Sequence, residues 1–273
     1  MDYNIKWDNL NARLRSFEGA AGDITVALAE LELDQRQTGF IKDDLTEVRR
    51  LICQNSMNPE LTFRVQVNPK RSRRHVGAGI GEPPPGEKVL NNGCFLCREN
   101  IRWQQRQQQI GFQISTNSNA YNVWMNPFPL MPNHVVIAAC EHVPQAWSNC
   151  KDTQGNMSLR QILSDFGETA QRLPGHVGFY NGVNAGASIP GHLHFQFFSR
   201  LSGHPVFPLE QCKFSDPTSA GEPRFSLGYP VPVALWRGPA KDVISNAVDW
   251  IADWEERNTH RRDSLSCNMI VAS

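Results

Sequence analysis

The stretch Gly191-His192-Leu193-His194-Phe195-Gln196-Phe197-Phe198 alternates polar and apolar side chains. In a β-strand, side chains two residues apart point to the same face. A strand here therefore has one polar face and one apolar face, formed by His192, His194 and Gln196 on one side and by Leu193, Phe195 and Phe197 on the other. Two imidazoles and an amide backed by an apolar wall can bind a metal, attack phosphorus and hold a phosphate oxygen. The alternative is a core strand with two hydrogen-bonded histidines.

The segment that leads into this stretch, Tyr180 to Pro190, is rich in glycine and other small residues. Such residues let the backbone come close to a bound ligand. Asn184 and Ser188 flank the turn before His192, where side chains and backbone amides can hold phosphate oxygens.

Composition limits the function classes. The chain has 273 residues, enough for one large domain or two small ones, and its 27 Lys and Arg balance its 27 Asp and Glu. No overall field therefore favours nucleic acid or an anionic membrane. No apolar run approaches the roughly 18 residues of a membrane span, and the amino terminus lacks a signal-peptide pattern. Seven scattered cysteines are unlike a disulfide framework, so we expect a cytoplasmic protein whose thiols are available for metal.

Periodicity predicts a mixture of helices and strands. Residues 5–55 are expected to be helical, partly because Leu45, Val48, Leu51 and Ile52 recur at helical spacing. The basic and then Gly/Pro-rich stretch from Lys70 to Glu87 is expected to be a long loop. We expect strands at 61–67, 121–126, 134–139, 177–180, 231–236 (an edge strand) and 268–273, and helices at about 159–173 and 241–257. The strand at 177–180 should pair antiparallel with the histidine strand.

A Cys-x-x-Cys motif, Cys94-Phe95-Leu96-Cys97, follows the Gly/Pro-rich stretch. A gap of two residues lets both thiolates reach one ion, and zinc prefers four nitrogen or sulfur ligands. By itself the motif is compatible with zinc, with a redox pair or with two buried cysteines. The absence of a thioredoxin-like pattern around it weakens the redox interpretation.

The segment Gly186-Ala187-Ser188…His192-Leu193-His194-Phe195-Gln196 resembles the active-site strand of the histidine-triad (HIT-like) superfamily. The similarity is to the HxHxQ branch, which contains galactose-1-phosphate uridylyltransferases, diadenosine tetraphosphate phosphorylases and GDP-hexose phosphorylases. It spans about residues 60 to 200. It implies an α+β fold with an antiparallel HIT-like sheet flanked by helices (59–273), preceded by an N-terminal helical segment (1–58).

The resemblance implies an enzyme, a nucleotidyltransferase or phosphorylase. His194 is then the nucleophile that takes a nucleotide from a nucleoside diphosphate sugar or a dinucleoside polyphosphate, and Gln196 contacts the phosphate. Phosphate or a sugar phosphate would be the acceptor, because glutamine at this place accompanies transfer in the superfamily and histidine accompanies hydrolysis. Two alternatives stay open: a hydrolase on the same scaffold, and a zinc-stabilised protein that binds nucleotides without turnover.

The resemblance also implies a structural zinc ion, with the ligands Cys94, Cys97, His142 and His192. His134 is a rival for the third ligand, although its position favours packing under the sheet. His142 could instead be an exposed turn residue.

Other residues match substrate contacts of the family. Arg71, with Arg74 second, matches an arginine near the substrate phosphates, and the segment Lys70–Arg74 could otherwise be a solvated charge run or a nucleic-acid patch. Asn126 matches an asparagine at the nucleoside, and Phe128 could pack on the base or in the core. A nucleotide is the expected partner and nucleic acid is not. The chain ends on a predicted strand, so we expect further chain or a partner to complete that edge, and a homodimer stays open.

Overall fold

The computed structural model describes residues 2–56, 58–76, 82–104, 108–148, 156–202, 206–258 and 266–273, apart from the side chains of 73–76 and 148. The chain forms two compact units. The first unit comprises Met1–Glu47, Pro69–Ser199 and Ser266–Ser273, and the second comprises Val48–Asn68 and Arg200–Leu265. The domain boundary expected at residue 58 stays a prediction.

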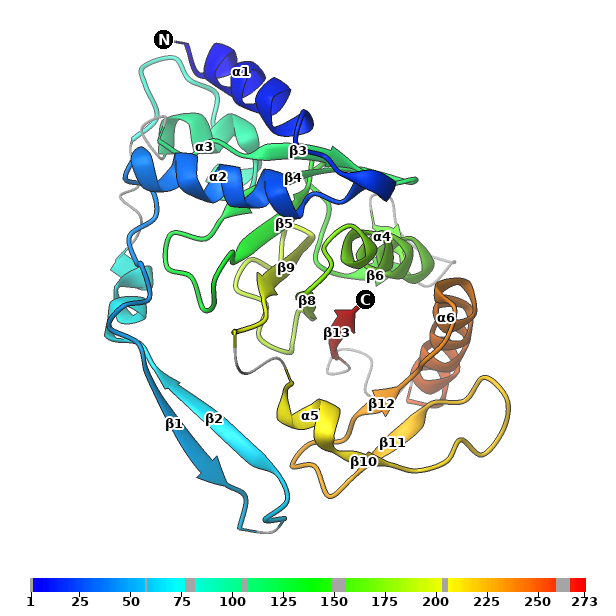
Figure 1. Cartoon of the computed structure of the whole chain (residues 1–273). Helices are drawn as coiled ribbons and strands as arrows, with labels where there is room; N and C mark the ends of the chain where they lie inside the picture. Colours follow the sequence, from blue (N-terminus) through cyan, green and yellow to red (C-terminus); the bar gives the residue numbers. More distant parts are fainter. Residues whose placement is uncertain are drawn as a thin grey trace. The chain divides into compact units, whose positions relative to one another are not determined.

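A six-stranded antiparallel sheet is the centre of the first unit (Figure 1). Its strands in spatial order are β13 (Asn268–Ala272), β8 (His176–Asn181), β9 (His194–Ser199), β5 (Val135–Ala139), β4 (Ala120–Met125) and β3 (Phe112–Ser115). Each neighbouring pair is antiparallel. The predicted α+β class with an antiparallel sheet and flanking helices is confirmed, as are the pairing of β8 with β9 and the terminal strand.

The histidine strand β9 lies inside this sheet, between β5 and β8. Its apolar side chains Phe195 and Phe197 are fully buried, as is Leu193 directly before the strand, which begins at His194 rather than at the predicted Gly191. Phe195 stacks on Phe166 of helix α4 (Leu159–Gln171), with 4.8 Å between the ring centroids. The predicted division of this strand into two faces is therefore confirmed, and Phe166 of α4 covers the apolar face by packing on Phe195 and Phe197.

Helices α1 (Tyr3–Arg15) and α2 (Thr25–Gln37) begin the first unit. Helix α1 closes the outer edge of β3, because the Asn11 side chain donates to the Gly111 carbonyl at 3.0 Å and accepts from the Gln113 N–H at 2.7 Å. An uncovered edge strand invites pairing with other chains. The remaining elements are α3 (Arg98–Gln104), the short pair β6 (Trp147–Ser148) and β7 (Met157–Ser158), and 3₁₀ turns at Ala20–Gly22, Pro69–Val76 and Asn91–Gly93.

In its described residues, the second unit contains two small sheets and two helices. Its elements are the hairpin β1 (Arg49–Gln54) and β2 (Thr62–Val67), the sheet β10 (Lys213–Phe214), β11 (Arg224–Leu227) and β12 (Ala234–Leu235), and helices α5 (Pro208–Gln211) and α6 (Ala240–Arg257). Trp250 of α6 packs against Phe225 and Trp236, with 6.1 and 5.7 Å between ring centroids. The predicted edge strand and last helix are confirmed.

Two predictions about the first hundred residues are wrong. The helix expected up to residue 55 ends at Gln37, and Arg49–Gln54 forms strand β1. Leu45 has a φ of 64°, which a continuous helix does not allow, and Leu51 and Ile52 are exposed rather than on a buried helical face. The loop expected at 70–87 is also partly wrong, because Pro69–Val76 forms a 3₁₀ helix. Residues 77–81 lie outside the described chain.

Candidate functional site

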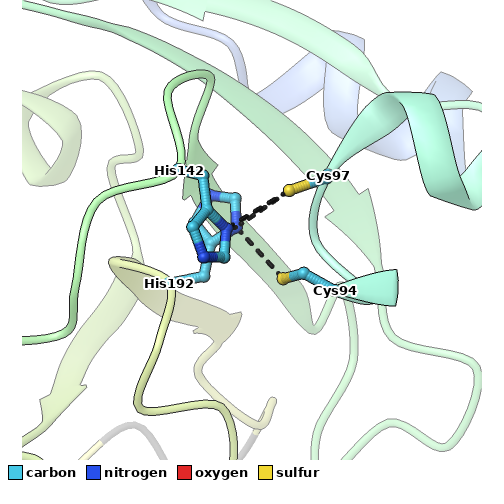
Figure 2. A group of neighbouring side chains, drawn as sticks. All are labelled: Cys94, Cys97, His142 and His192. Carbon is cyan, nitrogen blue, oxygen red and sulfur yellow. Dashed lines mark hydrogen bonds between the residues drawn. The ribbon is translucent and has the colours of Figure 1, made fainter. Parts of the chain in front are cut away.

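Cys94, Cys97, His142 and His192 form one cluster, and each offers a ligand atom within 4.8 Å of the others (Figure 2). The cysteines precede α3, His142 follows β5, and His192 precedes β9. Three segments that are distant in sequence therefore converge on one point. The four predicted metal-ligating residues lie close enough to hold a metal ion.

Hydrogen bonding prepares His192 to act as a ligand. Its Nε2 lies 2.8 Å from the carbonyl oxygen of Ala139, and the residue is fully buried. A carbonyl oxygen only accepts, so the ring proton of the neutral imidazole is on Nε2 and the lone pair is on Nδ1. This Nδ1 faces the cluster, 3.3 Å from the Cys94 Sγ and 3.3 Å from the His142 Nδ1. A backbone carbonyl behind a ligating histidine is a common way to fix such a ring.

Four of the distances between donor atoms, from 3.3 to 3.6 Å, fit a tetrahedral ion. Bond lengths of about 2.0 Å to nitrogen and 2.3 Å to sulfur, at tetrahedral angles, separate ligand atoms by about 3.3–3.8 Å. The Cys97 Sγ lies 3.4 Å from the His142 Nδ1 and 3.6 Å from the His192 Nδ1. The neighbouring Cys97 thiol, as a hydrogen-bond donor, lowers the pKa of the Cys94 thiol, which favours the thiolate that metal ions bind.

His134, the rival third ligand, belongs to a different cluster. Its ring is buried and bonds to Leu130 and Gln196. The expectation that it packs into the sheet rather than joins the cysteines is confirmed. His142 is exposed, as the alternative interpretation expected, and it nevertheless faces the cysteines and His192.

The ring orientation of His194 is also set by the backbone. Its Nδ1 lies 2.8 Å from the carbonyl oxygen of His192, so Nδ1 carries the proton and Nε2 keeps the lone pair. The side chain is 5% exposed, and burial lowers the pKa of His194 below its ordinary value. A neutral imidazole with a defined lone pair is therefore present at this position of the strand.

Gln145 holds the main chain of His194, a role that sequence reasoning did not find. The Gln145 Oε1 accepts from the His194 N–H at 2.6 Å, and its Nε2 donates to the His194 carbonyl at 3.0 Å. The same Nε2 donates to the carbonyl of Asn181 at 3.1 Å. Gln145 is buried in an irregular segment after β5, where no periodic pattern marks it.

Gln196 lies two residues beyond His194 on the same face of β9. Its register partners are Val136 on β5 and Phe179 on β8. Its Oε1 lies 3.0 Å from the Nε2 of His134, and its side chain is partly exposed. An amide on this face is a neutral donor or acceptor beside the His194 ring.

The loop between β4 and β5 joins several predicted substrate contacts. The Asn126 Oδ1 accepts from the Phe128 N–H at 2.9 Å, and the Asn126 N–H donates to the His134 carbonyl at 2.9 Å. An Arg71 guanidinium nitrogen donates to the Phe128 carbonyl at 2.6 Å. Phe128 is 8% exposed and therefore largely in the core. The structure thus connects Arg71, Asn126 and Phe128 through one loop that also contacts His134.

Three further residues, Asn184, Ser188 and Arg74, are predicted from the sequence to contact phosphate. Asn184 and Ser188 are exposed on the loop between β8 and β9. The Arg74 side chain lies outside the described residues. The contacts that these side chains were expected to make with phosphate stay predictions.

Two further features of the described chain are the hydropathy of its helices and the pairing of its cysteines. Within the described part of the chain, no helix is long and apolar enough to cross a membrane. The six cysteines that are described, Cys53, Cys94, Cys97, Cys140, Cys212 and Cys267, are all without a disulfide.

The first unit therefore combines an antiparallel sheet, a buried histidine strand within it, and a neighbouring cluster of two cysteines and two histidines. Residues 31–199 match a family described as a domain of unknown function, DUF4922, and the chain belongs to this family. No curated protein matches its sequence.

Solved structures of one enzyme resemble the chain in fold. The structure of yeast Ap4A phosphorylase Apa2 in complex with AMP gives a TM-score of 0.57 at 15% identity, and the match covers 89% of this chain and 74% of that chain. The complex of the same enzyme with Ap4A gives 0.55 at 14% identity, covering 89% and 77%. At this level of identity the likeness establishes a shared fold.

Proposed function

We propose that this protein is a nucleotidyltransferase or phosphorylase of the HIT-like superfamily, of the HxHxQ branch, that works through a covalent nucleotidyl-histidine. One observation carries the proposal. The His192 carbonyl holds the proton of His194 on Nδ1, which leaves the Nε2 lone pair available for attack, and Gln196 lies beside it on the same strand face. The fold shared with a phosphorylase that is seen bound to Ap4A supports a nucleotide substrate.

The reaction proceeds in two displacements. The Nε2 of His194 attacks the α-phosphorus of a nucleoside diphosphate sugar or dinucleoside polyphosphate, a P–N bond forms, and the P–O bond to the remaining phosphate ester breaks with its electron pair on oxygen. Phosphate or a sugar phosphate then attacks the same phosphorus, and the P–N bond breaks to restore neutral His194. Dividing one difficult displacement into two easier ones is the advantage of a covalent intermediate.

In the proposed reaction, the other residues of the site bind the phosphates, the nucleoside and the zinc ion. The Gln196 amide donates to a phosphate oxygen as charge builds on it, and Arg71, with Arg74, contacts the phosphates. Asn126 and Phe128 are on the nucleoside side, and Asn184 and Ser188 are on the phosphate side. Cys94, Cys97, His142 and His192 hold zinc, which when bound ties the cysteine loop to the histidine strand.

Product analysis tests the proposal. The protein is incubated with a panel of nucleoside diphosphate sugars and dinucleoside polyphosphates, each with phosphate, with a sugar phosphate, or with neither. We expect turnover of at least one panel member that requires an acceptor and is lost in His194→Ala. Turnover without an acceptor would favour the hydrolase instead. Binding without turnover under every condition would favour a protein that only binds nucleotides.

A further inference from the structure

The ring of His134 has only one proton arrangement that fits its neighbours. The Leu130 main-chain N–H lies 2.9 Å from the His134 Nδ1. A main-chain N–H can only donate, so Nδ1 must carry the lone pair. The proton of the neutral ring is then on Nε2. Because the opposing donor belongs to the backbone, this assignment does not depend on the orientation given to any amide side chain.

The same chain of donors orients Gln196. The His134 Nε2–H points at the Gln196 side chain, whose oxygen lies 3.0 Å away and accepts the bond. The two ends of an amide cannot exchange without losing this bond, so the Gln196 NH₂ group is directed away from His134. Among the described residues this nitrogen has no hydrogen-bond partner. It lies on the face of β9 that carries His194.

We propose that His134 is a positioning residue that fixes the Gln196 amide with its NH₂ group presented to the phosphate of the substrate. The inference rests on the proposed function, which makes Gln196 the phosphate donor. Without a fixed partner, the Gln196 amide can also turn its oxygen toward the phosphate, and that oxygen repels the phosphate. His134 removes that alternative by occupying the oxygen with a donor.

The environment of His134 keeps its ring in the required neutral form. Burial is the main cause that lowers the pKa of His134 to about 4, and the Arg71 charge adds to it. The ring packs against Phe179 and edge-on against Phe198, with centroids 6.2 Å away in both cases. A protonated ring would place an N–H against the Leu130 N–H, so the native structure disfavours it.

Two substitutions separate positioning from packing. His134→Phe keeps a planar ring and removes the donor, whereas His134→Gln places an amide nitrogen near the position of the imidazole Nε2. We expect kcat for nucleotide transfer to fall about tenfold in His134→Phe with KM changed less than about twofold, and to recover in His134→Gln. His176→Phe is the matched control, because His176 is also buried in the sheet and bonds to Ser199 instead. We expect it to keep the wild-type kcat.

A double substitution tests whether the effect passes through Gln196. Gln196→Ala alone should lower kcat about 100-fold. If His134 acts by orienting Gln196, adding His134→Phe should change kcat by less than about twofold further. Equal losses from His134→Phe with and without Gln196 would overturn the inference, because they would show a structural role only. Wild-type kcat in His134→Phe would overturn it as well.

A spectroscopic measurement tests the same inference without relying on turnover. The ¹⁵N chemical shifts of the His134 imidazole, assigned by their loss in His134→Phe, report which nitrogen carries the proton. We expect a proton on Nε2 and none on Nδ1 at neutral pH. A proton on Nδ1 would overturn the inference even in an active enzyme. A wild-type protein that transfers no nucleotide to any acceptor would instead remove the proposed function, and the positioning role with it.

Discussion

Backbone groups decide the proton positions of three histidines in the site. The Ala139 carbonyl fixes His192, the His192 carbonyl fixes His194, and the Leu130 N–H fixes His134. Each backbone group has a single hydrogen-bonding role, so each ring has one neutral arrangement. The result is a lone pair toward the cysteines in His192, a lone pair on Nε2 in His194, and a donor toward Gln196 in His134.

The buried neutral His134 should make stability depend on pH. The pKa of His134 in the folded protein is about 4, below the ordinary value of 6.5. Between these two pH values, the unfolded chain binds a proton at His134 and the native state does not. The contribution of neutral His134 to the free energy of unfolding is complete above about pH 6.5 and is lost as the pH falls toward 4. When the pH falls from about 7.5 to 5, we expect loss of this contribution to lower the free energy of unfolding by about 2 kcal/mol. Urea unfolding of wild type and His134→Phe at both pH values measures it, and an equal pH response in the two proteins would contradict it.

Gln145 should contribute to both stability and the position of the nucleophile. Gln145→Leu leaves the buried N–H and carbonyl of His194 without their partners. We expect the free energy of unfolding to fall by about 2–4 kcal/mol, because unpaired buried polar groups are costly. Urea unfolding checks the change, with Gln171→Leu at the exposed end of α4 as the control. A loss below about 0.5 kcal/mol would contradict the role assigned to Gln145.

At the scale of elements, alternation was a reliable guide where one face of a strand is buried. The alternation of Phe195 and Phe197 with polar residues predicts strand β9, because the core requires both aromatic side chains on one side. Strand β1 was missed because Leu51 and Ile52 are exposed, so their spacing reports no buried face. Its structure comes from pairing with β2, which local periodicity does not contain.

The cluster of Cys94, Cys97, His142 and His192 should bind a metal ion and so join three elements. We expect one zinc ion per chain by mass spectrometry of the bound metal, and a chelator should lower the Tm of wild type by roughly 5–10 °C. Cys97→Ser should contain less metal and show little response to the chelator. Cys140→Ser is the control, because the Cys140 thiol contacts Gln113 outside the cluster. Equal metal content in wild type and Cys97→Ser would contradict the assignment.

Asp165 should connect α4 to the hairpin of β3 and β4. The buried carboxylate accepts from the Thr116 hydroxyl at 2.7 Å, the Asn119 amide at 2.6 Å and the Tyr121 hydroxyl at 2.7 Å. Asp165→Ala leaves these donors unpaired, so we expect the free energy of unfolding to fall by about 3 kcal/mol.

The partly exposed Glu168 on the same helix provides the control for Asp165. Among the described residues, the Glu168 side chain bonds only to Asn117, and Glu168→Ala should cost less than about 1 kcal/mol. Urea unfolding compares the two variants. Equal losses would show that Asp165 has no special role in holding α4.

At the scale of the whole molecule, sequence motifs identify single site residues more reliably than they identify the contacts between residues that are distant in the sequence. Cys94, Cys97, His142 and His192 could be grouped in advance because a family resemblance assigned them one ion. Gln145 and His134 could not, because their roles arise from contacts across the sheet that leave no spacing in the sequence. The division into two units was equally inaccessible, since the second unit combines Val48–Asn68 with Arg200–Leu265.

The central claim is that His194 carries the nucleotide during the reaction. The most direct test is the intact mass of the protein after mixing with each panel member in the absence of any acceptor, followed by fragmentation of the adduct. We predict a gain of one nucleotide mass located on His194, its loss when the acceptor is added, and no gain in His194→Ala. A gain that persists in His194→Ala, or no gain while calorimetry shows the substrate bound, would contradict the account.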